Sequence, residues 1–253
     1  MIMQPSSQLE PSATVVLVRD AAGDRKAAGD NNIVGDNKVN GSGAGAAAGV
    51  EALLVQRHRD VSVAGGSWVF PGGKVEQGEL SQHANIEQAE KCAAVRECLE
   101  EAGIALEVEQ LQKFAHWITP TEMPRRFSTG FYIVAIDRNV TVQIDRSEIV
   151  EYRWLTPQHA IAQQACGELS LLPPTFVSLH ELASMESAAA AVAAFAQSQA
   201  KTFLPKIVRD AERQGAACVL YQGDSGYASA NPNVAGKQHR LLMGGGGYRY
   251  ICD

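Results

Sequence analysis

The sequence predicts an α/β protein, and three observations support this. Apolar, β-branched runs that are typical of strands recur along the N-terminal part of the chain. Residues 89–101 lie among them, contain no Gly or Pro and favour a helix. Hydrophobic residues make up 45% and charged residues 20% of the 253 residues, as expected for a globular protein with one large domain or one domain with appendages.

The first predicted strand covers residues 13–19, after a polar N-terminal tail over residues 1–12. Residues 20–49 are rich in Gly, Ala, Asp and Asn and contain almost no bulky apolar side chains. Such a segment cannot bury enough surface to offset its ordering entropy, so it predicts a flexible insertion loop. A functional lid is the alternative, which this composition favours less. A second strand is predicted over residues 50–57, so the loop interrupts a hairpin.

A glycine turn follows the short strand predicted over residues 67–70. In Phe70-Pro71-Gly72-Gly73 the backbone can approach a phosphate or a metal ion closely, because glycine has no side chain. Residues 80–88 then lead directly into the predicted helix over residues 89–101. They are expected either to add turns before that helix or to loop out at its start.

The end of this helix carries an acidic face. Glu97, Glu100 and Glu101 stand at positions i, i+3 and i+4, and Gly103 can take the left-handed conformation that closes a helix. Like charges repel, and a fold accepts that cost when a divalent cation such as Mg²⁺ or Mn²⁺ lies among them. Arg96 can hold one carboxylate while the others face the metal. The alternative interpretation is a solvated acidic face.

The remaining strands of the core are predicted over residues 106–116, 127–137 and 148–155. The second of these is apolar throughout residues 131–136, as expected for a strand that is covered on both faces. Beyond the core, helices are expected over residues 157–164 and 179–200, followed by short strands over residues 217–221, 240–243 and 248–251. We interpret residues 175–253 as a C-terminal helix and β-hairpin extension of a domain over residues 13–174.

The segment between two of these strands, residues 116–127, resembles a substrate rim. Arginine pairs well with phosphate oxygens and stacks on flat rings, so Arg125 and Arg126, together with Phe127, are predicted to contact substrate. The alternative is a solvated turn in which Trp117 fills the core. That alternative is favoured for either aromatic side chain taken alone.

Bulk properties exclude several classes of protein. A formal net charge of −6 and a pI near 5.6 argue against a nucleic-acid binder, and no apolar run approaches the length of a membrane span. No secretory signal is visible at the N-terminus. The five cysteines form no Cys-x-x-Cys pair and are odd in number, as expected for reduced thiols in a cytoplasmic protein.

The glycine turn and the acidic helix together resemble the signature of the Nudix hydrolases, Gly-x5-Glu-x7-Arg-Glu-apolar-x-Glu-Glu-x-Gly-apolar. Gly73 and Glu79 match its first half. Its second half is matched by Arg96, Glu97, Cys98, Glu100, Glu101, Gly103 and Ile104. The chain departs from the pattern in one respect: 16 residues, 80–95, separate Glu79 from Arg96 where the pattern has seven, which is an insertion of nine.

The resemblance implies a Nudix-type α/β/α sandwich with a mixed β-sheet. It also implies metal-dependent hydrolysis of a nucleoside diphosphate linked to another moiety, with Mg²⁺ or Mn²⁺ as the cofactor. Glu97 and Glu101 would be the principal ligands, Glu100 would assist or orient, and the backbone carbonyl of Gly73 would join the coordination shell. Many relatives dimerise, so a homodimer is expected.

The general base is harder to place. Some family members use a glutamate that follows the signature, and Glu148 is our candidate for that role or for an additional ligand. A surface carboxylate is an equally weighted alternative for Glu148. Glu122 and Glu151 compete with it, whereas a lone histidine such as His116 is more often structural.

Residues 13–174 further resemble the branch of the family that contains the peroxisomal coenzyme A diphosphatase of animal tissues and its bacterial relatives. The similar features are residues 68–73, the insertion within the signature, and the segments over residues 117–120 and 124–129, which contain Pro and Arg. Coenzyme A or an acyl derivative is therefore the first substrate expected. The basic motif of other coenzyme A diphosphatases is not matched by residues 57–69, so ADP-ribose or NADH remains the runner-up. A catalytically silent nucleotide-binding domain is the alternative of another class.

Overall fold

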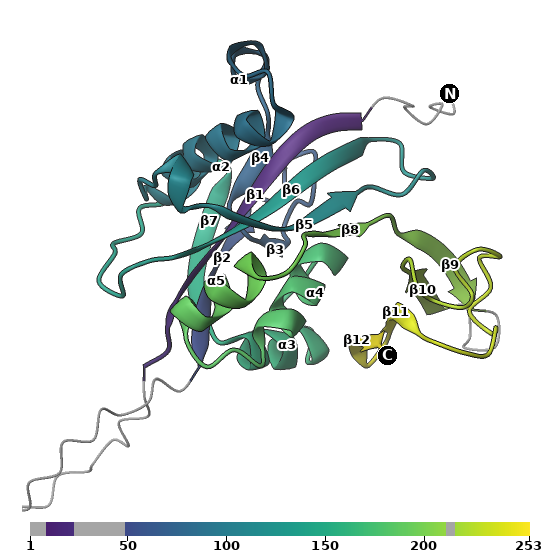
Figure 1. Ribbon diagram of the computed structural model, residues 1–253. Helices are drawn as coiled ribbons and strands as arrows, with labels where there is room; N and C mark the ends of the chain where they lie inside the picture. Colours follow the sequence, from purple (N-terminus) through teal and green to yellow (C-terminus); the bar gives the residue numbers. More distant parts are fainter. Residues whose placement is uncertain (1–8, 23–48, 211–215) are drawn as a thin grey trace, which may run out of the picture.

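The computed structural model describes residues 9–22, 49–210 and 216–253, which form a larger and a smaller β-sheet with helices packed on the larger one (Figure 1). Most of the predicted insertion loop, residues 23–48, lies outside the described residues, as do residues 1–8 of the predicted tail. The prediction of a flexible loop therefore stays a prediction.

The larger sheet is mixed, as predicted. Its strands are β1 (Leu9–Asp20), β2 (Val50–Arg57), β3 (Trp68–Val69), β4 (Gly72–Lys74), β5 (Gln112–Ile118), β6 (Arg126–Ala135), β7 (Ile149–Leu155) and β8 (Lys201–Phe203). Their order is β3-β2-β1-β6-β5-β8, and β4 also pairs with β1 and β7 with β2. The β1–β6 and β5–β8 pairs are parallel, whereas the other pairs are antiparallel.

Helices cover both faces of this sheet, because successive side chains of a strand point to opposite faces. Val15 and Leu17 of β1 pack in the core beneath α2 (Ile86–Ala102), whereas Val16 and Val18 belong to a second core on the other side. Three further helices lie on that second side (Figure 1): α3 (Pro157–Ala165), α4 (Pro173–Leu182) and α5 (Ala188–Ala196). The architecture is the predicted α/β/α sandwich.

Strand β6 confirms the strand predicted to be covered on both faces. Phe131 and Ile133 belong to the core on the α3–α5 side, and Tyr132 and Val134 to the core beneath α2. Trp117 is also buried and stacks on Phe203 with ring centroids 4.0 Å apart. For Trp117, the favoured core interpretation is therefore correct.

The segment between the two halves of the signature, residues 80–95, contains the end of a short helix, a turn and the first part of α2. Helix α1 (Gln77–Gln82) is separated from α2 by His83 to Asn85, and the Asn85 side chain accepts a hydrogen bond from the Glu87 backbone at 2.9 Å. This is a side-chain N-cap, which favours a helix start at this point. Helix α2 ends as predicted, because Gly103 has φ 68° and its N–H donates to the Leu99 carbonyl.

Two predicted strands begin at residues that differ clearly from those in the structure. Strand β1 begins at Leu9, four residues inside the predicted tail, because residues 9–12 continue the parallel pairing with β6. The strand predicted over residues 106–116 starts only at Gln112. It is preceded by a 3-10 turn, η1 (Val108–Gln110), in which Glu107 and Gln110 cap each other.

The prediction of a single helix over residues 179–200 is wrong. The structure has two helices in this region, because α4 ends at Leu182 and α5 begins at Ala188. The Ser187 side chain accepts a hydrogen bond from Ala190 N at 3.1 Å and caps α5. The backbone N–H of Ala188 donates to the Asp20 carboxylate at 2.8 Å. This contact with the end of β1 fixes the start of α5, and an alanine-rich pattern carries no sign of it.

The C-terminal extension is part of the main core rather than an appendage. Strand β8 joins the larger sheet beside β5, and the predicted boundary at residue 174 falls inside α4. The smaller antiparallel sheet consists of β9 (Lys206–Asp210), β10 (Ala216–Leu220), β11 (His239–Gly244) and β12 (Gly247–Cys252). Tyr221 and Leu241 share a buried cluster with Trp117, so this sheet closes one end of the core.

No helix within the described ranges is long and apolar enough to span a membrane.

Candidate active site

The glycine turn lies directly against the C-terminal half of α2. Strand β4 pairs with β1 so that Gly73 faces Ala13, and the Gly72 backbone N–H donates to Glu101 Oε2 at 2.9 Å. A Cβ atom on Gly73 would overlap the Glu97 carboxylate. Glycine is required here because the helix brings two carboxylates against the backbone of the turn.

These two carboxylates lie in a buried setting. The Glu101 side chain is 6% exposed, and burial raises the pKa of Glu101 to about 8. Burial also raises the pKa of Glu97, although the neighbouring Arg96 opposes this effect. Burial and nearby like charge both disfavour the ionised form, and a cation beside the two groups would restore it.

Arg96 contacts three carboxylates rather than the one expected. Its Nη1 lies 2.9 Å from Glu97 Oε1 and 3.0 Å from Glu100 Oε2, and its Nε lies 3.0 Å from Glu79 Oε1. Nη2 donates to the Lys74 carbonyl at 2.9 Å, which ties the helix to β4. Arg96 therefore links the two halves of the signature across the insertion.

The three glutamates of the acidic face do not converge on one point. The Glu100 side chain is 57% exposed beside Arg96, whereas the Glu97 side chain is 17% exposed against the turn. In the described ranges, no group of three or more His, Cys, Asp or Glu side chains is placed to hold a metal ion. The remaining donor set is Glu97, Glu101 and the glycine backbone. This set fits Mg²⁺, which is commonly bound by one or two carboxylates and completed by water and substrate phosphates.

Arg57 is a site residue that the sequence analysis missed. It is the last residue of β2, and its guanidinium lies 3.2 Å from Glu101 Oε1 and 3.2 Å from Glu148 Oε2. The candidate base is thus joined to Glu101 through one arginine. The alternation of side chains along the strand could have indicated this position. Arg57 follows Leu53 and Val55 at every second residue, and those two side chains pack beneath α2.

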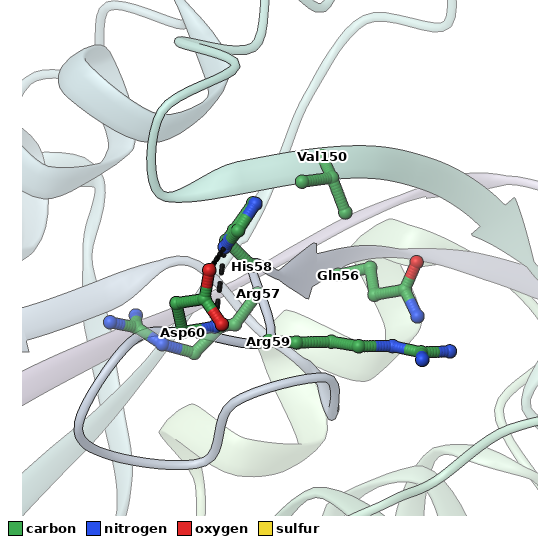
Figure 2. A pocket seen from close by; sticks show the side chains of 6 residues that line it. All are labelled: Gln56, Arg57, His58, Arg59, Asp60 and Val150. Carbon is green, nitrogen blue, oxygen red and sulfur yellow. Dashed lines mark hydrogen bonds and ion pairs between the residues drawn. The ribbon is translucent and has the colours of Figure 1, made fainter.

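A cavity of about 380 Å³ adjoins this arginine. Figure 2 shows Arg59 and Gln56 extending along one side of it and the His58–Asp60 pair on the other. The lining residues are Gln56, Arg57, His58, Arg59, Asp60 and Val150. Arg57 is both a lining residue of this cavity and a contact of Glu101, whereas Glu101 itself does not line the cavity.

The predicted rim arginines are separated from each other. Arg125 Nε lies 3.1 Å from Glu10, and Arg125 Nη1 lies 3.3 Å from Ser62 Oγ. Lys74, at the end of the glycine turn, pairs with the same Glu10. Arg125 is therefore connected to the site through Glu10.

Arg126, by contrast, is turned into its own hairpin, where its Nε donates to the Thr119 carbonyl at 3.2 Å. Phe127 lies beneath Arg125, with the guanidinium carbon 5.5 Å from the ring centroid. Of the predicted pair, Arg125 is the one that is linked to the glycine turn, through Glu10 and Lys74.

The competing candidates for a base lie elsewhere. Glu151 pairs with Arg153 at 2.9 Å, and Glu122 is exposed in the turn between β5 and β6. His116 Nε2 lies 2.8 Å from Ser128 Oγ, and burial lowers the pKa of this histidine. Among these carboxylates, Glu148 is the one that the structure joins to Glu101.

Comparisons with known proteins identify the family of this chain. A family model described as the NUDIX domain matches residues 44–173, just over half of the chain. A solved structure, the NUDIX hydrolase from Alicyclobacillus acidocaldarius, shares the fold with a TM-score of 0.58 and 18% identity. The likeness covers 74% of this chain and 96% of that one.

Curated relatives match over shorter stretches. A Caenorhabditis elegans protein provisionally named nudix hydrolase 7 is 26% identical over 169 residues, which is 53% of this chain and 56% of the relative. The acyl-coenzyme A diphosphatase NUDT19 of Xenopus laevis is 29% identical over 76 residues, 28% of this chain and 20% of the relative. The matches thus span about half of the first relative and a fifth of the second. With the family model and the shared fold, they show that the chain belongs to the Nudix hydrolase family.

Proposed function

We propose that this chain holds Mg²⁺ or Mn²⁺ with Glu97, Glu101 and the Gly73 carbonyl and hydrolyses a nucleoside diphosphate linked to another moiety. Nudix hydrolases act on pyrophosphate-containing substrates and generally use divalent metal ions. The observation that carries the proposal is the convergence of Glu97 and Glu101 on the backbone of Gly72 and Gly73. A bound divalent cation would neutralise the diphosphate and lower the pKa of a bound water.

The chain's own residues have distinct parts in this proposal. Arg96 orients the Glu97 carboxylate. It also holds Glu100 at the solvent-exposed edge of the site, where Glu100 assists or orients the metal ligands. Glu148 accepts the proton of the attacking water or serves as an additional ligand. Its link to Glu101 through Arg57 supports this role, and so does its 61% exposed side chain, which a water molecule can reach.

Coenzyme A or an acyl-coenzyme A is the first substrate that we propose, cleaved to a phosphopantetheine product and an adenosine bisphosphate. The partial match to the frog acyl-coenzyme A diphosphatase supports this choice. Arg125 and Phe127 would contact the anionic and flat parts of the substrate, and Arg126 would do so after leaving the Thr119 carbonyl.

ADP-ribose or NADH is the second candidate, because the same donor set suits any nucleoside diphosphate derivative. A catalytically silent nucleotide-binding domain is the third. We place the protein in the cytoplasm as a homodimer that acts on a small molecule without a nucleic-acid or membrane partner. The formal net charge of −6 supports the absence of a nucleic-acid partner.

The test is a hydrolysis assay of the purified full chain with Mg²⁺ and coenzyme A, acetyl-coenzyme A, ADP-ribose or NADH, with products separated by chromatography. We expect adenosine bisphosphate from coenzyme A, and no product from the Glu101→Gln variant. Glu109→Gln, which changes an exposed carboxylate on η1, is the matched control and should keep full activity. Product from ADP-ribose or NADH alone selects the second candidate. Tight binding of one compound without release of any product selects the silent domain.

A further inference from the structure

The main chains around Arg57 and Glu148 are held side by side. The pairing of β2 with β7 shifts register between Gln56 and Arg57, so Gln56 faces Glu151 and Arg57 faces Ile149. The next residue, His58, donates its backbone N–H to the Glu148 carbonyl at 2.6 Å. This irregularity brings the start of β7 against the end of β2, next to the carboxylates of α2.

The Arg57 guanidinium spans two carboxylates with different exposure. Its Nη1 and Nη2 lie 3.2 Å from Glu101 Oε1 and 3.2 Å from Glu148 Oε2. The Arg57 side chain is only 17% exposed, and its Nε is buried without a hydrogen-bond partner among the described residues. A planar guanidinium can bridge two groups in this way, whereas an ammonium of the same charge acts as a single point.

Glu148 depends on this arginine for the placement of its side chain. Its backbone is fixed by Asp145, whose carboxylate accepts from Glu148 N at 2.8 Å and from Ile149 N at 3.0 Å. Within the described part of the chain, Arg57 is the partner that the Glu148 carboxylate contacts. Glu101 is similarly held by Gly72 N on one oxygen and by Arg57 on the other.

We propose that Arg57 is a positioning residue for the hydrolysis: it fixes the orientation of the Glu101 carboxylate and ties Glu148 to it. The inference rests on the proposed function, because it concerns the residues assigned there to the metal and to the base. Arg57 acts through these two carboxylates. Its ability to bridge two carboxylates, and not its charge alone, is what the site requires.

Mn²⁺ binding without substrate provides the first test, measured by electron paramagnetic resonance of free Mn²⁺ in titrations of the purified full chain. Arg57→Lys keeps the charge but loses the bridge. We expect it to weaken Mn²⁺ binding about 10-fold, the lower end of the range for partners that orient metal ligands. Arg57→Gln should weaken it at least as much.

Arg19→Lys is the matched control. Arg19 lies on neighbouring β1, its side chain is 16% exposed, and it pairs with Glu51 at 2.8 Å. Arg19 is therefore an equally buried, paired arginine of the same sheet, outside the carboxylate site. Its variant should bind Mn²⁺ like wild type. Thermal unfolding of each variant checks that a weaker Mn²⁺ affinity does not come from a loss of fold.

A kinetic arm tests the link to Glu148. In wild type, Arg57→Lys should lower kcat more than it changes KM, because it disturbs groups that act in the transition state. In a Glu148→Ala background the same substitution should lower kcat by a smaller factor, since one of the two partners of Arg57 is already absent. An equal fold-loss of kcat in both backgrounds would overturn the proposal that Arg57 positions Glu148.

The outcomes separate this inference from the proposed function. Unchanged or tighter Mn²⁺ binding by Arg57→Lys, or an equal loss in Arg19→Lys, overturns the positioning role. If wild type binds Mn²⁺ but hydrolyses none of the four compounds, the proposed function fails while the titration still decides the role of Arg57. If wild type binds no Mn²⁺, both fail.

Discussion

The backbone N–H of Gly72 donates to Glu101 Oε2 at 2.9 Å, and this bond joins the glycine turn to the helix that carries the acidic face. The Glu101 carboxylate is nearly excluded from water, and Arg57 contacts its other oxygen. A buried carboxylate with one backbone donor and one cation is sensitive to protonation, to metal binding and to the space around the turn.

The stability of the metal-free protein should fall as the pH rises through the titration range of Glu101. Burial raises its pKa from 4.5 to about 8, so in this window the folded chain binds more protons than the unfolded chain. The stabilising contribution is fully present below about pH 4.5 and is lost as the pH rises through about 8. Burial raises the pKa of Glu97 as well, which acts in the same direction.

Urea unfolding in the presence of a chelator, at several pH values across this window, measures the effect. Glu101→Gln should show a smaller decline in unfolding free energy than wild type, because the amide does not titrate. Added Mn²⁺ should reduce the decline in wild type, since the cation binds the ionised carboxylate. If the unfolding free energies of wild type and variant depend on pH in the same way, the Glu101 carboxyl does not have a pKa raised by burial.

Gly73→Ala should weaken the metal site while leaving most of the fold intact. The added Cβ would overlap the Glu97 carboxylate and push it away from the turn. We expect a loss of about 10-fold or more in Mn²⁺ affinity and turnover, by analogy with other changes that displace metal ligands. Gly78→Ala on α1 is the control, because a Cβ there meets no atom within 4 Å. Equal behaviour of the two variants would show that the close approach at Gly73 has no role.

Calcium should not support turnover, whereas manganese should replace magnesium. Mg²⁺ and Mn²⁺ are small ions with defined octahedral geometry, and Ca²⁺ is larger and takes more oxygen ligands at longer distances. Two carboxylates of α2 that are held against the glycine turn suit the smaller ions. Initial rates with each ion, measured at saturating substrate, test this expectation. Comparable rates with Ca²⁺ would contradict the proposed mechanism.

Glu90→Ala should destabilise the fold by about 3 kcal/mol, because it leaves one partner of a buried ion pair without compensation. Glu90 on α2 is buried, Lys113 Nζ lies 2.8 Å from its carboxylate, and the Tyr132 hydroxyl donates to it at 2.7 Å. Tyr132→Phe removes one hydrogen bond to this charge and should cost only about 1–2 kcal/mol. Denaturant titrations of both variants decide the order. A larger loss for Tyr132→Phe would show that the lysine is not the main partner.

Local signals in the sequence were reliable where neighbouring residues decide the outcome. The end of α2 at Gly103 follows from a left-handed glycine, and the coverage of β6 on both faces follows from its unbroken apolar run. The two halves of the signature lie together in the structure despite the insertion of nine residues, because the Arg96 side chain contacts Glu79 across it. Each of these features depends on a spacing within one element or on one side chain's reach.

Contacts between distant residues account for the misses. The break between α4 and α5 depends on Asp20, which lies far away in sequence on β1. The early start of β1 depends on its pairing with β6. The separation of Arg125 from Arg126 depends on Glu10 and on the Thr119 carbonyl, which attract the two guanidinium groups to different sides.

The sequence by itself determined which chemical groups the site can use: carboxylates at helical spacing, an arginine next to them and a glycine turn close by in the chain. Only the tertiary structure decided that Glu97 and Glu101 face the turn while Glu100 faces solvent, and that Arg57 reaches Glu148 from another strand. The physical reason is that side-chain types and helical periodicity are local properties. The direction in which a helix face points, and the strand end that meets it, are set by sheet register and core packing.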